Sequence, residues 1–392
     1  MAGLVIKPRA RIFHGHEWVY GADVLKTFGD PEPGAVVSLK DFRDKPLGSG
    51  IYNPKSQIVA RRFSRHREEL DQDFFERRIQ RAWRRREALP HLDRTLCRVV
   101  WSESDGLPGV VIDRYGPHFV LQTLTLAMDI RKQLIAAALV KVLGAETVIE
   151  RNDNTIRLAE GMEVMTGMLH GEMPAPFRVT TDCGTFLIDL NAGQKTGIYL
   201  DQLDNYRASA QWSKGRTVLD CFSNQGGFAL AAAAAGATHV TAVDSSESAL
   251  AAARENAEAM GVSDRLTFVC ANVFDFLKEQ ETAGSQWDQI ILDPPSFARS
   301  RKNLNDAMRG YKEIHLRSLK LIPNGGILST FCCSHHVSTG DFRSIILESA
   351  VDAKRTLSVL ASHGQRSDHP ILLGVPESEY LRGFTFELLA AF

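Results

Sequence analysis

Two adjacent cysteines, Cys332 and Cys333, follow an apolar run and precede a serine and two histidines in the stretch STFCCSHHVS. A metal site here would need further ligands at matching spacing, and the sequence offers no second pair of that kind. Successive side chains on an extended backbone point to opposite sides. We therefore expect Cys332 to be buried and Cys333 to be an accessible thiol, which makes Cys333 a candidate nucleophile.

Three aspartates each end an apolar run that is typical of a buried strand. Asp220 follows TVL, Asp244 follows HVTAV and Asp293 follows QIIL. From about residue 185 onward such runs alternate with helical patterns, which predicts a parallel, doubly wound α/β sheet. Ligands of these sheets bind at the carboxyl ends of the strands. We expect the three carboxylates and Cys333 to meet at that edge.

The turn after Asp220 is polar and contains a pair of glycines, but it lacks the GxGxxG pattern of a dinucleotide site. A dinucleotide needs a cradle for its pyrophosphate, whereas S-adenosylmethionine carries a positive sulfonium and a positive amino group that suit nearby carboxylates. We therefore favour S-adenosylmethionine over a dinucleotide. The candidate donor contacts are Asp220, Phe222, Ser223, Asn224, Gly226, Gly227, Asp244, Ser245, Asn272, Val273 and Asp293.

A thiol beside a methyl donor has a specific use with a pyrimidine base. C5 of the ring is a poor nucleophile, and addition of a thiolate to C6 creates an enamine whose C5 can accept a methyl group. Asp293 could hydrogen-bond or protonate N3 of cytosine. Pro294 and Pro295 cannot continue a strand and could form part of the pocket for a base pulled from its stack. The catalytic candidates are thus Cys333 and Asp293, with the two prolines as substrate contacts.

The first hundred residues are basic, with 20 Lys and Arg against 13 Asp and Glu, although the whole chain has a net charge of −1. Residues 1–68 contain short runs of β-forming residues separated by turn residues, which predicts a small β-rich module. An amphipathic helical pattern follows and ends at Pro90. Arg81, Arg84 and Arg85 lie on its polar faces and are candidate contacts for a polyanion such as RNA. A solvated helix face is the alternative.

The chain resembles the PUA-domain-containing ribosomal RNA large-subunit cytosine-C5 methyltransferases, a family of class I S-adenosylmethionine-dependent RNA methyltransferases. RIFHGHEWVY and PLGSGIYNPKSQIVAR resemble the PUA module, and DGLPGVVIDRYG resembles the central domain. GQKTGIYLDQ, LDCFSNQGGFALAAAAAGA, LDPPSFA and CCSHH resemble the catalytic domain. The resemblance implies a PUA RNA-binding domain at 1–68, a basic helix with an α+β central domain at 69–180, and a Rossmann-like methyltransferase domain at 181–392.

The resemblance also implies roles that the residues alone do not suggest. It implies methyl transfer to C5 of a cytosine in 23S ribosomal RNA through a covalent bond between cysteine and C6. The family pattern around the nucleophile is commonly Ser-Cys-Ser, which gives the nucleophile position to Cys333, and Cys332 stands where serine is usual. The further donor contacts implied by the stretch QKTGIYLDQ are Lys195, Thr196, Gly197, Tyr199 and Asp201.

Two other functions remain as alternatives. The same fold could methylate an exocyclic base nitrogen, although Cys333 argues against this, or the chain could be a non-catalytic RNA-binding or ribosome assembly factor. No run approaches 18 apolar residues, so we expect no membrane span. Six cysteines without repeated spacing favour a reducing cytoplasm. We expect no metal, and the oligomeric state stays open with a homodimer as one alternative.

Overall fold

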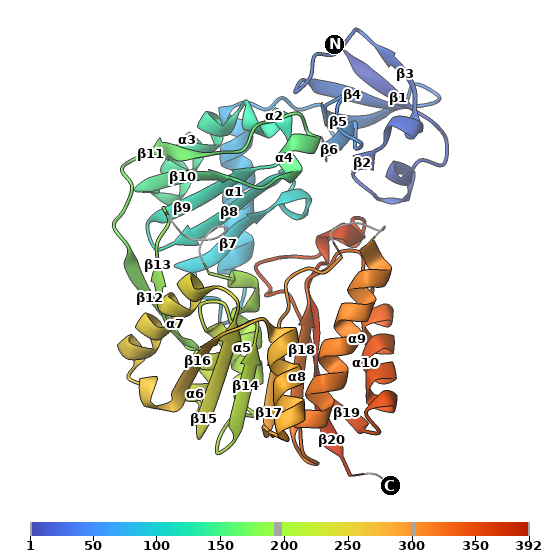
Figure 1. The fold of residues 1–392 in the computed structure, drawn as a ribbon. Helices are drawn as coiled ribbons and strands as arrows, with labels where there is room; N and C mark the ends of the chain where they lie inside the picture. Colours follow the sequence, from blue (N-terminus) through green and yellow to red (C-terminus); the bar gives the residue numbers. More distant parts are fainter. Residues whose placement is uncertain (1, 192–197, 299–302, 391–392) are drawn as a thin grey trace. The chain divides into compact units, whose positions relative to one another are not determined.

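The computed structural model describes residues 2–191, 198–298 and 303–390, and the chain divides into two compact units (Figure 1). Each unit is assembled from segments that are far apart in the sequence, because the chain crosses between the units several times. The predicted three-domain division stays a prediction. Unit 1 comprises Met1–Phe177, Ile188–Leu200 and Ser367–Ser378, and unit 2 comprises Arg178–Leu187, Asp201–Arg366 and Glu379–Phe392.

The first sheet of unit 1 has six strands in the order β2-β6-β5-β4-β1-β3. Its strands are short and separated by turn residues, as the sequence predicts for the N-terminal module, and Leu4, Ile6, Val37 and Leu39 fill its core. β1 runs parallel to β4, while the other neighbours are antiparallel. The elements are β1 (Gly3–Ile6), η1 (Arg11–His14), β2 (Trp18–Val19), η2 (Gly21–Asp23), β3 (Val24–Phe28), β4 (Val36–Asp41), β5 (Pro46–Tyr52) and β6 (Ala60–Ser64).

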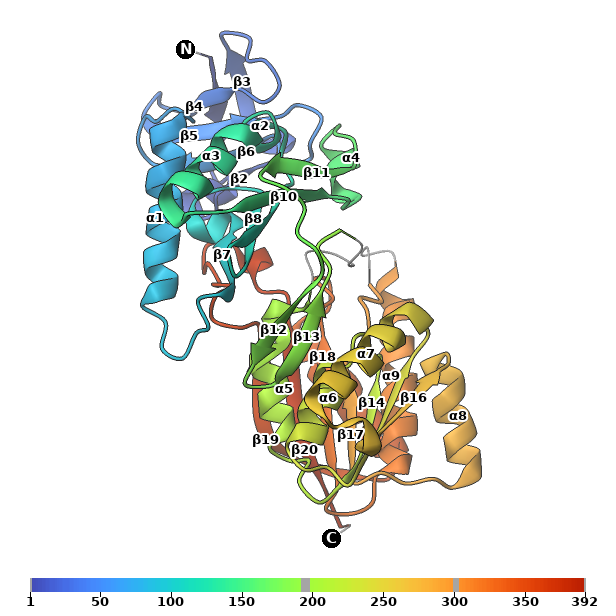
Figure 2. The ribbon, with the colours of Figure 1, turned by 90° about the vertical axis from the view of Figure 1, so that its left-hand side faces the viewer.

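The second sheet of unit 1 has five strands in the order β11-β10-β9-β8-β7, and helices α1 and α3 pack against it (Figure 2). Helix α1 begins where the Asp71 side chain accepts a hydrogen bond from the Phe74 N–H, and it buries Phe74, Phe75 and Ile79. The elements are α1 (Gln72–Glu87), β7 (Leu96–Trp101), η3 (Ser102–Asp105), β8 (Val110–Tyr115), β9 (His118–Thr123), α2 (Leu126–Asp129), α3 (Lys132–Leu143), β10 (Thr147–Asn152), α4 (Ile156–Ala159) and β11 (Met165–His170).

Unit 2 contains a seven-stranded sheet in the order β16-β15-β14-β17-β18-β20-β19, which confirms the predicted doubly wound α/β fold. The strands β14 to β18 are parallel, and β20 runs antiparallel to both of its neighbours. The order reverses between β14 and β17, which is where ligands of such sheets bind. The strands are β14 (Thr217–Cys221), β15 (His239–Asp244), β16 (Leu266–Cys270), β17 (Gln289–Leu292), β18 (Ile327–Cys332), β19 (Thr356–Gly364) and β20 (Arg382–Leu389).

Helices cover both faces of this sheet, with α5, α6 and α7 on one face and α8, α9 and α10 on the other (Figures 1 and 2). Within the described ranges, no helix combines the length and the apolar character needed to cross a membrane. The remaining elements are β12 (Phe177–Thr181), β13 (Gly184–Ile188), η4 (Leu200–Gln202), α5 (Leu203–Ala210), α6 (Gly227–Ala234), α7 (Glu247–Met260), η5 (Ser263–Arg265), α8 (Val273–Ala283), α9 (Leu304–Leu321), α10 (Thr339–Asp352) and η7 (Pro376–Ser378).

Candidate active site

The three predicted aspartates lie at the carboxyl edge of the sheet in unit 2. Asp220 is in β14, Asp244 ends the neighbouring strand β15, and Asp293 follows β17 on the other side of β14. Burial raises the pKa of Asp220 well above its ordinary value, and the negative charges of Asp293 and then Asp244 raise it further. The carboxyl group of Asp220 is therefore close enough to each of the other two to be repelled by it.

Asp220 has a buried oxygen without a partner. The side chain is fully buried, and its Oδ2 atom accepts a hydrogen bond of 2.9 Å from the Ala229 N–H. Its Oδ1 atom has no hydrogen-bond partner among the described residues. A buried polar atom in this state is costly, and a positively charged ligand group would satisfy it and relieve the repulsion. The site therefore fits a cationic donor such as S-adenosylmethionine.

The turn after β14 is organised by Asp244. The Asn224 N–H donates to Oδ2 of Asp244 and the Ser246 N–H donates to Oδ1, each over 2.9 Å. Phe222 and Asn224 both have left-handed backbone, with φ of 64° and 47°, so the turn is tightly bent. The Asp244 carboxylate is thus held in one orientation, and each oxygen retains a lone pair for a ligand. Ser223 of the same turn is buried.

The two glycines of the turn have different structural roles. Gly226 has φ of +83°, a conformation that favours glycine. A Cβ atom on Gly227 would lie 2.3 Å from Cζ of Tyr206, so the ring of Tyr206 occupies that space. Tyr206 also packs edge-on against Phe228. Close packing between α5 and α6 therefore explains Gly227, and its predicted contact with the donor stays a prediction.

The donor candidates that follow β15 and β16 lie at the start of a helix or in the core. Ser245 is exposed, and its neighbour Ser246 caps α7. Asn272 caps α8, because its Oδ1 atom accepts the Phe274 N–H over 2.9 Å. Val273 is 3% exposed and belongs to the core between the helices and the sheet. A contact of Asn272 or Val273 with adenine stays a prediction.

The two cysteines differ as the sequence predicts. Cys332 is the last residue of β18 and is fully buried, with its Sγ atom 3.3 Å from Oη of Tyr311. Cys333 follows the strand and is partly exposed. Its thiol donates a weak hydrogen bond to the carbonyl oxygen of Pro294 over 3.8 Å. The thiol therefore lies beside the Asp293-Pro294-Pro295 loop, in which Pro295 is exposed.

A buried glutamine that the sequence analysis missed holds Asp293. The Nε2 atom of Gln202 lies 3.0 Å from both carboxylate oxygens of Asp293, and its Oε1 atom accepts a hydrogen bond of 2.6 Å from Asn205. Gln202 directly follows Asp201 in the stretch QKTGIYLDQ, which the resemblance connects with the donor site, so the sequence does point to this region. Asp201 itself accepts a hydrogen bond of 2.6 Å from the Tyr380 hydroxyl.

A buried serine connects the loops after β17 and β18. The Oγ atom of Ser334 lies 3.1 Å from Oγ of Ser296 and 3.0 Å from Oη of Tyr311. The backbone oxygen of Ser334 accepts a hydrogen bond of 2.9 Å from Arg382. These contacts fix the loop that carries Cys333 against the loop that carries Asp293. Ser334 is the second serine of the Ser-Cys-Ser pattern, and no role is predicted for it from the sequence.

The structure does not place several predicted site residues with respect to this edge. Lys195, Thr196 and Gly197 lie outside the described residues. Tyr199 belongs to unit 1, as do Arg81, Arg84 and Arg85, which lie on α1. Because the two units are described separately, none of these four residues is placed with respect to the aspartates. In the described ranges no group of three His, Cys, Asp or Glu could hold a metal ion.

The chain matches two protein families. Residues 157–363 match the family described as S-adenosylmethionine-dependent methyltransferase, and residues 6–65 match the family described as PUA-like domain. The first match spans the three aspartates and both cysteines of the candidate site, and the second spans most of the six-stranded sheet of unit 1.

Curated relatives match nearly the full length. The chain is 38% identical over 378 residues to "Ribosomal RNA large subunit methyltransferase I" of Klebsiella pneumoniae subsp. pneumoniae, covering 95% of this chain and 94% of that protein. It is 40% identical over 379 residues to the protein of the same name from Vibrio parahaemolyticus, covering 95% of this chain and 96% of that protein.

Two solved structures share the whole fold. A Streptococcus mutans protein assigned to the SAM-dependent methyltransferases aligns with a TM-score of 0.84 and 23% identity, over 99% of this chain and 100% of that one. SMU.776, assigned as a methyltransferase and crystallised with S-adenosylhomocysteine, aligns with a TM-score of 0.85 and 24% identity, over the same shares of the two chains.

Proposed function

This chain belongs to the family of S-adenosylmethionine-dependent methyltransferases that includes the large-subunit ribosomal RNA methyltransferases I, and we propose that it methylates C5 of a cytosine in large-subunit ribosomal RNA. One observation carries the proposal. The partly exposed Cys333 thiol lies 3.8 Å from the carbonyl oxygen of Pro294, in the loop that begins with Asp293. Methylation of an exocyclic nitrogen needs no such thiol, because a nitrogen lone pair is already nucleophilic.

The chemistry follows from the positions of these two side chains. When bound, the donor supplies an electrophilic methyl group on its sulfonium. The Cys333 thiolate forms a bond to C6 of cytosine, and the electron pair of the C5–C6 double bond moves toward C5 and N3. Asp293 stabilises or protonates N3. Once C5 has taken the methyl group and S-adenosylhomocysteine is left, the C5 proton passes to water, the C5–C6 double bond re-forms and the Cys333 thiolate leaves C6.

The surroundings keep these groups in place. Gln202 binds both oxygens of Asp293, and Ser334 ties together the loops that carry Asp293 and Cys333. Such fixed supports lower the cost of orienting the reacting groups. We place the donor against Asp220 and Asp244, because a positive group of the donor would satisfy the buried oxygen of Asp220 and offset the charge repulsion there. Action in the cytoplasm and a homodimer stay predictions.

The first test is a pair of cysteine variants. We expect Cys333→Ala to abolish methyl transfer to large-subunit ribosomal RNA while it binds S-adenosylhomocysteine with unchanged affinity, because the thiol acts on the base. Cys332→Ser is the matched control and should keep most activity, since its side chain is buried against Tyr311. Mass spectrometry of the RNA nucleosides identifies the product. Full activity of Cys333→Ala, or a nitrogen-methylated nucleoside, would reject the proposal.

A trapped intermediate tests the covalent step directly. RNA that carries 5-fluorocytidine at the target should form a stable adduct, because fluorine at C5 cannot leave as a proton does. We expect peptide mapping to find the RNA on Cys333. An adduct on Cys332 would show that Cys332, and not Cys333, is the nucleophile. The absence of any adduct in an active preparation would exclude the covalent route.

A further inference from the structure

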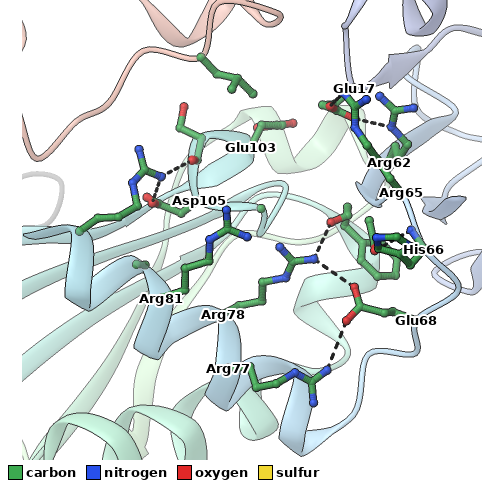
Figure 3. Close-up of a pocket in the computed structure, with 17 residues that line it drawn as sticks. Glu17, Arg62, Arg65, His66, Glu68, Arg77, Arg78, Arg81, Glu103 and Asp105 are labelled. Atoms are coloured by element: carbon green, nitrogen blue, oxygen red, sulfur yellow. Dashed lines mark hydrogen bonds and ion pairs between the residues drawn. The ribbon is translucent and has the colours of Figure 1, made fainter. Parts of the chain in front are cut away.

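Unit 1 contains an arginine-rich cavity of about 590 Å³, which we call the arginine cavity (Figure 3). It is formed by the end of β6, the segment that links β6 to α1, one face of α1, and the turn η3. Six arginines and four carboxylates line it. The arginines are Arg62, Arg65, Arg77, Arg78, Arg81 and Arg85.

Two of the carboxylates each bind a pair of these arginines. Glu17 accepts a hydrogen bond from Arg62 and lies 3.8 Å from Arg65. Glu68 binds Arg77 over 3.3 Å and Arg78 over 3.1 Å (Figure 3). A carboxylate shared between two guanidinium groups holds both in position and neutralises only one of them. Each pair therefore retains positive charge.

The other two carboxylates are largely engaged by arginines outside the lining. Glu103 accepts hydrogen bonds from Arg61 over 2.8 Å and from the indole of Trp18 over 2.7 Å. Asp105 accepts two hydrogen bonds from Arg86, over 2.6 and 2.8 Å, in addition to one from Arg85. The positive charge that faces the cavity therefore exceeds what the lining carboxylates neutralise.

Arg81 has no partner of its own. It is exposed, and no ion pair or hydrogen bond involves it among the residues that the structure describes. Figure 3 shows it on α1 beside Arg78, in the opening between Asp105 and the Glu68 pair. Burial lowers the pKa of Arg78; Glu68 opposes this shift, and the positive charge of Arg81 lowers the pKa further. The cavity thus holds positive charges close together, and a bound anion would reduce the repulsion between them.

Arg78 is held rigidly at the wall of the cavity. Its guanidinium lies over the ring of Phe74, 5.0 Å from the centroid, and its Nη2 atom donates to the backbone oxygen of Phe63 and to Glu68. A Cβ atom on Gly106 would lie 2.9 Å from Nη1 of Arg78, so glycine leaves the space for this group. No described residue accepts a hydrogen bond from Nη1. A guanidinium fixed in this way loses little entropy when it binds a ligand.

We propose that the arginine cavity binds the phosphodiester backbone of RNA. Planar guanidinium forks match phosphate oxygens in pairs, and every cation of the lining, His66 aside, is an arginine. The excess of charge is small, which suits one or two singly charged phosphodiesters better than a triphosphate. The inference rests on the proposed function in one respect, namely that the substrate is RNA, and it adds a binding site to which neither Cys333 nor any aspartate of the sheet edge contributes.

The test is a salt titration of RNA binding in the absence of donor. A short fluorescein-labelled single-stranded RNA of mixed sequence serves as the probe, between about 50 and 200 mM salt. We expect Arg81→Gln to weaken binding several-fold and to reduce the slope of log K against log salt by about 0.7, the value for one phosphate contact on a single strand. Because Arg81 has no partner, the variant should keep the wild-type melting temperature and affinity for S-adenosylhomocysteine.

The matched control removes one positive charge from a neighbouring helix. Lys141 lies on α3, is exposed, forms an ion pair with Glu76 and does not line the cavity. Lys141→Gln should leave the affinity and the slope nearly unchanged. Arg65→Gln, from the opposite wall, should act like Arg81→Gln, and the double variant should lose about twice the slope of either, roughly 1.4.

The outcomes separate this inference from the proposed function. Unchanged affinity and slope in Arg81→Gln, or an equal loss in Lys141→Gln, overturn the arginine cavity as an RNA site whatever nucleoside the enzyme makes. Stronger displacement of RNA by inorganic phosphate or by poly-glutamate than by sodium chloride of equal ionic strength would assign the cavity to free phosphate or to an acidic protein segment. A loss in Arg81→Gln supports the site even if the methylated atom is not C5.

Discussion

The acidic sheet edge of unit 2 and the arginine cavity of unit 1 both contain buried carboxylates, but the charges around these carboxylates have opposite signs. Asp220 is fully buried, and burial and two neighbouring aspartates raise its pKa. Burial would also raise the pKa of Glu103, but the charge of Arg61 and hydrogen bonds from Ser102 and Trp18 lower it. Both groups are buried, so the difference lies in the partners that the fold supplies.

This difference indicates which groups are left for a ligand. A carboxylate with its own arginine, such as Glu103, is part of the support structure. Asp220 has a buried oxygen without a partner, and Arg81 is a cation without one among the described residues. The two groups have opposite signs and lie in different units. Unit 2 therefore suits a cationic methyl donor, and unit 1 suits a polyanion.

The largest effect on donor binding is expected at Asp244. We expect Asp244→Ala to weaken S-adenosylmethionine binding at least tenfold, because hydrogen bonds to a charged group contribute about 1.5–3 kcal/mol each and the carboxylate can bind both ribose hydroxyls. Isothermal titration calorimetry measures this. Glu255→Ala, which removes an exposed carboxylate from α7, is the control and should bind normally. Unchanged affinity in Asp244→Ala would contradict the assignment of the acidic edge to the donor.

Two isosteric amide variants test the comparison itself. At neutral pH we expect Glu103→Gln to destabilise unit 1 by about 2 kcal/mol, because the buried Arg61 loses its nearer charged partner and keeps only Glu160, at 3.8 Å. Asp220→Asn should leave unit 2 equally or more stable, because a neutral amide avoids the repulsion from Asp293, while donor affinity falls. Hydrogen exchange of peptides from β7 and from β14 reports the two units separately. Equal destabilisation by both variants would show that the two carboxyl groups do not differ in their contribution to stability.

The pH dependence of these variants should have opposite signs. The raised pKa of Asp220 means that its contribution to stability is present in acid, below its unfolded pKa near 3.8, and is lost as the pH rises through its folded pKa. Glu103 has a lowered pKa, so its contribution is present above its unfolded pKa near 4.5 and is lost as the pH falls through its folded pKa. The stability of Asp220→Asn relative to the wild type should therefore increase with rising pH, and the stability of Glu103→Gln relative to the wild type should decrease.

A smaller effect is expected at Gln202. Gln202→Leu removes both hydrogen bonds to Asp293 without changing the size of the side chain much. We expect kcat to fall a few-fold, with the KM for RNA and the affinity for S-adenosylhomocysteine unchanged, because we assign Gln202 to positioning Asp293 and not to binding donor or RNA. Gln202→Asn, which retains the amide, should recover part of the loss. A rise in KM with normal kcat would show that Gln202 acts on substrate binding instead.

The strand ends of unit 2 could be located from local pattern alone. Apolar runs that stop at Asp220, Asp244, Asp293 and Cys333 each predict a strand and a residue at or next to its carboxyl end, and the alternation of strands with helices predicts the parallel sheet. The burial of Cys332 follows from the alternation of side chains along a strand. Helix starts such as Asp71 are similarly local, because the cap bonds to a backbone N–H a few residues away.

Which charges lack a partner could be decided only by the tertiary structure. Arg78, Arg81 and Arg84 look alike in the sequence, yet Arg78 binds Glu68 whereas Arg81 has no partner among the described residues, because segments far apart in the chain meet at the arginine cavity. The sequence could not show that the ring of Tyr206 fills the space beside Gly227, which explains the glycine without a ligand. Periodicity depends on near neighbours along the chain, whereas pairing and desolvation depend on side chains that meet only after folding.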